Sequence, residues 1–254
     1  GRLELLGSRG LKVVIDRGSF CGIYVQGTVD LLEGEKVLDL RFYAAETPLG
    51  ETLRCLGVKE GLADGDFLME GSLKARGVRD PLKEGSRGSL YLYSGEGRIY
   101  RLTVLSRLFS VVNLTEVFRG KLPDFTGRGF PYDRLEVWGD IRDGVLWIRE
   151  GIIEGPSMKI FAEGKVELYS GRLDLKVLVA PFRTVDALLS RVPLLGYILT
   201  GKSKTFLSLP FHIKGDYRKP EVTPLPPSAV GRGLLGIVER TLKMPFKVIE
   251  PVLP

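Results

Sequence analysis

The amino-acid sequence predicts a mainly β protein in which a long, curved antiparallel meander forms an open apolar groove, with a few amphipathic helices covering its end. Apolar and polar residues alternate with period two along much of the 254-residue chain, as expected for strands that bury one face. Short turn-like sequences join these runs, which is typical of hairpin connections. The 32 glycines also recur inside the runs, where they favour the bends and bulges that curve a sheet.

The alternation is clearest in five runs, at residues 21–31, 38–44, 67–75, 172–179 and 207–213. Turn sequences occur at 33–35, 64–65, 94–97, 143–144 and 170–171. Together they predict about ten to twelve strands, each with one apolar and one polar face. The apolar residues that we expect to line the groove are Ile23, Val25, Val29, Leu38, Leu40, Phe42, Phe67, Met69, Leu73, Leu173, Leu175, Val177, Val179, Leu207, Leu209, Phe211 and Ile213.

Three segments have apolar residues at helical spacing instead, at residues 102–118, 184–199 and 229–243. We expect residues 1–227 to form the groove domain with the first two helices inserted, and residues 228–254 to form a C-terminal amphipathic helix and tail. The stripe of the last helix consists of Val230, Leu234, Leu235, Ile237, Val238 and Leu242. Each helix can cover an open end of the sheet or contact a membrane. For the last one we predict a membrane-facing position near the exit of the groove.

The composition restricts the possible partners. The formal charge of +6 is spread along the chain, with Lys and Arg alternating with apolar residues, so it favours solvated strand faces over a nucleic-acid stripe. No run of about 18 uncharged apolar residues occurs, and we therefore expect no membrane-spanning segment in this sequence. A single Gln and a single Asn beside abundant Lys, Arg and Glu indicate a thermophilic host.

Two phosphate-loop patterns fail on their context. Residues 196–203 match G-x-x-x-x-G-K-S, but a helical pattern precedes them and a strand pattern follows, the reverse of a nucleotide-binding loop. Residues 231–236 match G-x-G-x-x-G, but Pro-Pro-Ser stands where the strand of a dinucleotide site is needed. We therefore expect no nucleotide partner.

The residues of catalytic and metal sites are scarce. One histidine, His212, and two cysteines leave a thiolate or imidazole metal site without enough ligands. His212 also falls on the polar face of a predicted strand, with no placed nucleophile or acid in the pattern. We expect no metal, no cofactor and no enzymatic activity. The two cysteines, Cys21 and Cys55, can form a disulfide or remain two buried thiols.

Several segments, in order and spacing, resemble the C-terminal region of the AsmA-like family, YhdP type. They are residues 105–123, Gly129-Phe-Pro-Tyr-Asp133, Gly155-Pro-Ser-Met-Lys159, residues 192–202, and residues 222–230 leading into 234–245; the N-terminal part with Leu53-Arg-Cys-Leu56 is similar but less distinctive.

The resemblance implies a periplasmic part of a bridge-like lipid transfer protein that an upstream segment outside this sequence anchors in the inner membrane. Its implied partners are phospholipid or another acyl-chain lipid in the groove, and the outer membrane surface or an envelope protein at the C-terminal end. No catalytic motif comes with the family. An envelope location also favours a disulfide between Cys21 and Cys55.

A lipid conduit is physically consistent with one-sided apolar strands. Each CH₂ group exposed to water costs about 0.8 kcal/mol, so a sixteen-carbon tail faces a barrier of roughly ten kcal/mol or more outside an apolar groove. The competing interpretation is a closed β-sandwich that serves as a structural or protein-interaction module of the cell envelope. Strands in such a sandwich show the same alternation. The two interpretations differ in whether the apolar faces enclose an open groove or pack only against each other.

Overall fold

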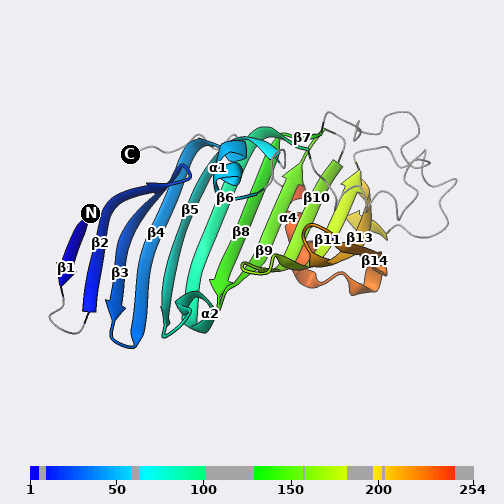
Figure 1. The fold of residues 1–254 in the computed structure, drawn as a ribbon. Helices are drawn as coiled ribbons and strands as arrows, with labels where there is room; N and C mark the ends of the chain where they lie inside the picture. The colour runs from blue at the N-terminus through cyan, green and yellow to red at the C-terminus, as the bar shows by residue number, and fades with distance from the viewer. Residues whose placement is uncertain are drawn as a thin grey trace.

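The computed structural model describes residues 1–5, 10–58, 63–100, 129–156, 158–181, 197–201 and 204–243. In these residues fourteen strands form one antiparallel sheet, whose main path runs β1-β2-β3-β4-β5-β6-β8-β9-β10-β11-β13-β12. Figure 1 shows the strands side by side from β1 to β13, in nearly their order along the chain. The predicted fold, a mainly β, curved and open antiparallel meander, is confirmed.

The strands are β1 (Arg2–Leu5), β2 (Gly10–Phe20), β3 (Ile23–Leu32), β4 (Glu35–Pro48), β5 (Ala63–Gly77), β6 (Ser86–Ile99), β7 (Phe130–Tyr132), β8 (Arg134–Arg142), β9 (Val145–Glu154), β10 (Met158–Glu167), β11 (Arg172–Pro181), β12 (Tyr197–Gly201), β13 (Lys204–Asp216) and β14 (Glu221–Pro224). The helices are α1 (Leu49–Cys55), α2 (Pro81–Gly85), the 3₁₀ turn η3 (Pro227–Ala229) and α4 (Arg232–Lys243).

The two ends of the sheet do not pair with each other. In the described residues β1 pairs only with β2, and β12 pairs only with β13, while β7 and β14 add short strands beside β6 and β13. The sheet is therefore open, which disfavours the closed sandwich that the alternation alone also allowed. An apolar face of this sheet is therefore either covered by helices or other groups outside the sheet, or it remains accessible.

Three of the five predicted turns are present. Asp143 and Gly144 join β8 to β9 with φ of 50° and 76°, the left-handed pair that a tight hairpin requires. The turns predicted at 64–65 and 94–97 are wrong, because Gly65 pairs with Gly97 inside the β5–β6 ladder. These glycines leave room for Tyr132, whose hydroxyl donates a 2.7 Å hydrogen bond to the carbonyl of Asp64.

The short helices follow local signals that periodicity does not capture. Helix α2 begins at Pro81 after Asp80, whose side chain accepts a hydrogen bond from the backbone N–H of Lys83. Of the predicted helices, residues 102–118 lie outside the described residues. So does most of 184–199, and the helix is wrong for the last part of that range, since Tyr197–Gly201 is strand β12.

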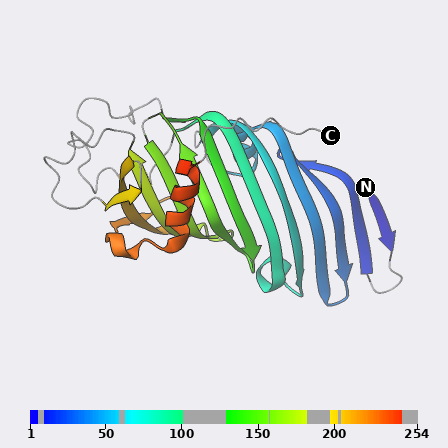
Figure 2. The same ribbon diagram turned by 180° about the vertical axis from the view of Figure 1, so that it is seen from behind.

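Helices α1 and α4 lie on opposite faces of the sheet. Helix α1 packs on the face that carries Met69, and the register places Ala162 on that same face. Helix α4 packs on Phe161, the neighbour of Ala162 in β10, and therefore covers the other face. Figure 2 shows α4 in front of the strands, whereas α1 lies behind them.

Candidate functional site: the apolar face of the sheet

One face of the sheet carries apolar rows that run from β2 to β13. Residues paired directly across neighbouring strands share a face, so the register traces rows of side chains. The first row is Ile15, Gly27, Leu40, Leu73, Gly88, Ile141, Leu146, Val166, Leu173 and Gly215; the second is Gly18, Val25, Phe42, Gly71, Leu90, Gly139, Ile148, Gly164, Leu175 and Ile213; the third is Ala44, Met69, Leu92, Val137, Gly151, Ala162, Val177 and Phe211. None of the three rows contains a charged residue, and we call the surface they form the groove face.

The groove face is long, and its accessibility changes along its length. Eleven strand spacings of about 4.8 Å separate the ends of the main path, which gives roughly 50 Å. Side chains near the N-terminal end, such as Val25 and Leu40, are half-buried. Those near the C-terminal end, such as Phe211, are fully buried in a cluster with Phe130 and Tyr132. Apolar surface therefore remains accessible mainly on β2–β9.

The predicted groove residues come together on this face. All those with described side chains lie on it, in the three rows or in the adjoining rows that contain Val29, Leu38, Phe67, Val179 and Leu209. Leu207 lies in β13, but its side chain is outside the described residues. Contact of these residues with lipid stays a prediction.

The sequence analysis missed the middle of the face. Strands β6, β8, β9 and β10 contribute Leu90, Leu92, Val137, Ile148 and Ala162, none of which was among the predicted residues. The signal was present, since Leu90 and Leu92 alternate with two tyrosines. Glycines occupy several apolar positions of these strands. Because glycine is neither clearly apolar nor polar, the period-two pattern is interrupted there and the strand face is not recognised.

At one glycine of the groove face, an aromatic ring from the neighbouring strand replaces the missing side chain. Gly71 has no side chain, and the ring of Phe42 on the neighbouring strand fills the space above it, where an added Cβ would overlap the ring. An aromatic ring that covers a cross-strand glycine supplies the packing which the glycine lacks. Phe42 thus keeps the second row continuous across β5.

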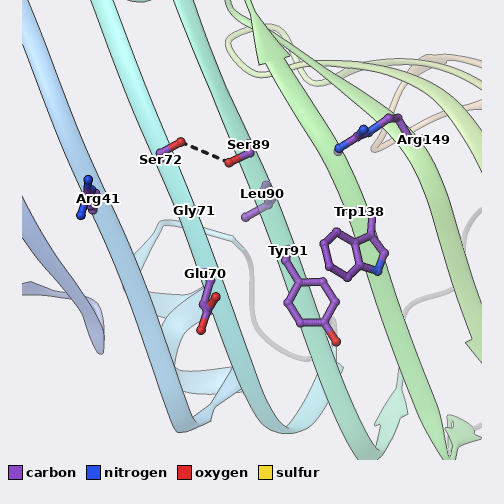
Figure 3. Close-up of a pocket in the computed structure, with 10 residues that line it drawn as sticks. Arg41, Glu70, Gly71, Ser72, Ser89, Leu90, Tyr91, Trp138 and Arg149 are labelled. Carbon is purple, nitrogen blue, oxygen red and sulfur yellow. Dashed lines mark hydrogen bonds between the residues drawn. The ribbon is translucent and has the colours of Figure 1, made fainter. Parts of the chain in front are cut away.

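The opposite face, which we call the outer face, is polar over most of the sheet. Figure 3 shows part of it, where Ser72 of β5 and Ser89 of β6 share a 3.1 Å hydrogen bond between Arg41 and Arg149. His212 lies on this face too, with its Nε2 atom 2.7 Å from a carboxylate oxygen of Asp174. That hydrogen bond lowers the pKa of Asp174 below its ordinary value.

The polar side chains of the described residues form no cluster of metal-ligand type. Among the described residues, no group of three or more His, Cys, Asp or Glu side chains is placed to hold a metal ion. No helix in the described ranges is long and apolar enough to cross a membrane. The apolar groove face is therefore the most extensive candidate for function.

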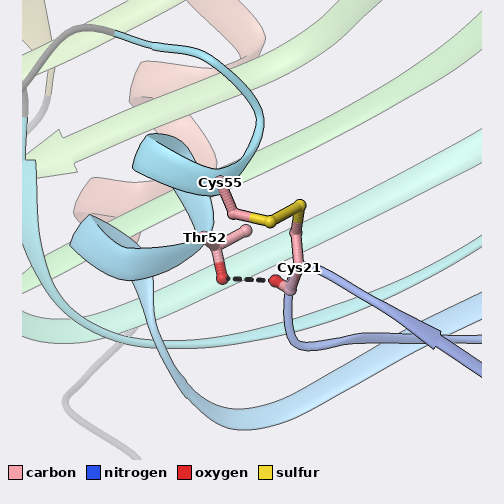
Figure 4. Close-up of a disulfide and its surroundings, with 3 residues drawn as sticks. All are labelled: Cys21, Thr52 and Cys55. Carbon is pink, nitrogen blue, oxygen red and sulfur yellow. Dashed lines mark hydrogen bonds between the residues drawn. A yellow bond between two sulfur atoms is a disulfide. The ribbon is translucent and has the colours of Figure 1, made fainter.

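Helix α1 stands at one edge of the groove face and is tied to the sheet. Leu49 and Leu53 pack with Phe67 and Met69 on that face. Cys55 at the end of α1 forms a disulfide with Cys21 in the turn after β2, and their Cα atoms are 5.4 Å apart. Figure 4 shows the disulfide beside Thr52, whose hydroxyl donates a 2.9 Å hydrogen bond to the carbonyl of Cys21. The disulfide therefore fixes α1 against the β2–β3 hairpin.

Helix α4 lies where the C-terminal stripe was predicted, and it packs on the outer face of the sheet. Leu234, Ile237 and Val238 are buried on the outer face of β9–β11, and Val230 packs beside them. Leu235 is half-buried, and the side chain of Leu242 is outside the described residues. Arg240 also pairs with Glu150 of β9 at 2.7 Å.

The position of α4 has a local cause in the sheet. Residues 177–180 are a continuous apolar run, which places apolar side chains on both faces of β11. Such a run needs cover on both sides. Leu178 and Ala180 receive theirs from α4. In this structure the stripe contacts the sheet, and a membrane-facing role, which stays a prediction, requires α4 to leave that surface.

Comparisons with known proteins place the sequence in a family. The sequence profile of the family described as "YhdP protein" matches residues 22–222. A curated relative from Escherichia coli (strain K12), "Intermembrane phospholipid transporter YhdP", is 26% identical over 151 residues, which cover 53% of this chain and 12% of the relative. No solved structure matches the chain. Because the family profile spans well over half of its residues, the chain belongs to the YhdP family.

Proposed function

We propose that this chain is a section of a lipid conduit that carries phospholipid between the inner and outer membranes, with the acyl chains lying against the groove face. The observation that carries the proposal is the set of three uncharged rows that continue across neighbouring strands, two of them from β2 to β13 and the third from β4 to β13. The name of the E. coli relative, a phospholipid transporter, supports lipid as the cargo.

The groove face suits a sliding cargo better than a tightly held ligand. An acyl chain gains about 0.8 kcal/mol for each CH₂ group that it buries, wherever along the face it lies. Because the rows offer no charged group, no single position along them holds a headgroup. The free energy of a tail then changes little from strand to strand, which is the condition for movement along the sheet.

The proposed setting is the periplasm, in a protein anchored to the inner membrane by a segment outside this sequence. An oxidising compartment suits the disulfide between Cys21 and Cys55. We propose a non-enzymatic role, with the outer membrane surface or an envelope protein as the partner at the C-terminal end. The 151 matched residues cover 12% of the length of the E. coli relative.

The proposal is tested by a matched pair of neighbouring substitutions. Val25 is half-buried on the groove face, and Gln26 is exposed on the outer face of the same strand. Val25→Glu places a charge in the second row, so we expect loss of most co-purified phospholipid, measured by native mass spectrometry. Gln26→Glu adds the same charge on the other face and should leave the lipid load unchanged.

Thermal unfolding of both variants serves as the control for folding. Equal lipid loads in a folded Val25→Glu protein and in the Gln26→Glu protein would contradict the proposal. Loss of lipid from both variants would point instead to a general effect of net charge.

A further inference from the structure

A line of aromatic and acidic side chains crosses the outer face. The register places Tyr24, Tyr43, Glu70, Tyr91, Trp138 and Glu150 directly opposite one another on β3, β4, β5, β6, β8 and β9. The first two rings stack with centroids 5.0 Å apart, and the rings of Tyr91 and Trp138 lie 4.1 Å apart. We call this line the outer ladder. It contains two aromatic pairs about three strand spacings, roughly 14 Å, apart.

A shallow depression of about 340 Å³ lies along the outer ladder at its second aromatic pair. Its walls include Tyr91 and Trp138, with Arg41 and Arg149 at the two ends and the Ser72–Ser89 hydroxyl pair between them (Figure 3). Trp138 is 43% exposed although its ring lies against Tyr91 at a tilt of 35°. The volume is at the lower end of the range for small-molecule sites.

Two charged groups beside the aromatic pair have no ion-pair or hydrogen-bond partner among the described residues. Arg41 and Glu70 make neither an ion pair nor a hydrogen bond with the part of the chain that the structure describes. Arg149, in contrast, pairs with Asp140 at 3.1 Å. The depression therefore offers one free guanidinium and one free carboxylate, whose charges cancel, together with two hydroxyl groups.

The geometry points to a binding site for the neutral hexopyranose rings of a glycan chain. A sugar ring presents a flat C–H face that stacks on an exposed aromatic ring, and a rim of hydroxyl groups that need both donors and acceptors. Trp138 and Tyr91 supply the aromatic surface for the C–H face. Arg41, Glu70 and the serine pair supply donors and acceptors for the hydroxyl groups. The second aromatic pair on the same line, Tyr24 with Tyr43, extends the site along a linear polymer.

The balance of charge selects this class of ligand over an anionic one. A phosphate or a carboxylate polymer meets Arg41, but it also meets the carboxylate of Glu70, while Arg149 shares the carboxylate of Asp140 with Arg142. Cross-strand stacking alone accounts for the paired rings, since such pairs stabilise sheets. It does not account for an unpaired arginine and an unpaired glutamate flanking them.

The site is separate from the groove face, because the outer ladder and the three apolar rows are on opposite sides of the same strands. The inference therefore goes beyond the proposed lipid role and does not depend on it. Val25→Glu, which alters the groove face, should leave glycan binding unchanged, so failure of one proposal can be distinguished from failure of the other.

Tryptophan fluorescence tests the inference directly. The chain has two tryptophans, and Trp147→Phe leaves Trp138 as the sole reporter at the outer ladder. In this background, cellohexaose and chitohexaose should each produce a saturable change in emission. Arg41→Ala and Glu70→Gln should each weaken the affinity by about tenfold, because each removes a charged hydrogen-bonding partner. Since neither side chain has a partner in the described chain, both variants should keep the thermal unfolding midpoint of the parent.

The matched control is Arg87→Ala, which removes another exposed arginine from the outer face of β6, away from the depression. It should bind both hexaoses like the parent. The inference is overturned if neither hexaose changes the emission at about 10 mM, or if Arg41→Ala and Glu70→Gln bind as well as Arg87→Ala. Binding only to phosphatidylglycerol vesicles, with loss in Arg41→Ala, also overturns it and assigns the site to a lipid headgroup.

Discussion

At the scale of single residues, the continuity of the groove face depends on positions that have no side chain. Gly71 interrupts the second row, and the ring of Phe42 covers the gap from the neighbouring strand. Alternation in the sequence predicted the face of the sheet on which Phe42 lies. The role of Gly71 was not predictable in the same way, because a glycine has no polarity to place on a face, and only the register shows what fills its space.

Gly71→Ala tests this packing. The added methyl group overlaps the Phe42 ring and comes within 2.6 Å of the backbone carbonyl oxygen of Ser89, so both must shift, and we expect a loss of about 1 to 3 kcal/mol in the free energy of unfolding. Gly95→Ala is the control, because an added Cβ there has no neighbour within 4 Å. Urea unfolding of the two variants and of Gly71→Ala/Phe42→Leu measures the effect, and the smaller leucine should recover part of the loss. Equal stability of both alanine variants would contradict the close packing of Gly71 against Phe42 and Ser89.

At the scale of elements, the helices were the least predictable part of the fold. The stripe of α4 was recognisable from its spacing, but its docking surface depends on apolar residues of β9–β11 that point away from the groove, such as Phe161 and Leu178. The consecutive apolar residues 177–180 indicate a strand that is buried on both faces. An interpretation based only on alternation assigns them to one face and misses the docking surface of α4. Helix α2 is shorter than two turns, so no periodicity can develop, although Asp80-Pro81 is a typical helix start.

The docking of α4 is tested by a buried and an exposed substitution in the same helix. Ile237 is 1% exposed against the sheet, so Ile237→Ala should cost about 2 to 5 kcal/mol in unfolding free energy. Arg240→Ala removes only a largely exposed ion pair with Glu150 and should cost less than about 1 kcal/mol. If α4 faces a membrane instead, Ile237→Ala should leave the urea midpoint unchanged and weaken vesicle binding.

At the scale of the whole molecule, alternation predicted an apolar face, and the pairing of the strands determined what that face becomes. An open groove and a closed sandwich share the same pattern, because a strand facing lipid and a strand facing another sheet bury equivalent residues. The unpaired edges of β1 and β12 in the described residues distinguish the open groove from the closed sandwich. Which edges stay unpaired depends on long-range pairing that no local sequence pattern contains. The family resemblance supplied the correct alternative before the register was known.

The central claim is that lipid tails lie along the groove face and not along the outer face. Site-specific photo-crosslinking in cells tests it most directly, with benzoylphenylalanine placed at Leu73 or Lys74 of β5 and at Leu146 or Trp147 of β9 in the full-length protein. Each pair consists of sequence neighbours on opposite faces. We predict phospholipid adducts from positions 73 and 146 and none above background from 74 and 147. Adducts of equal yield from both faces, or adducts only from 74 and 147, would contradict the account.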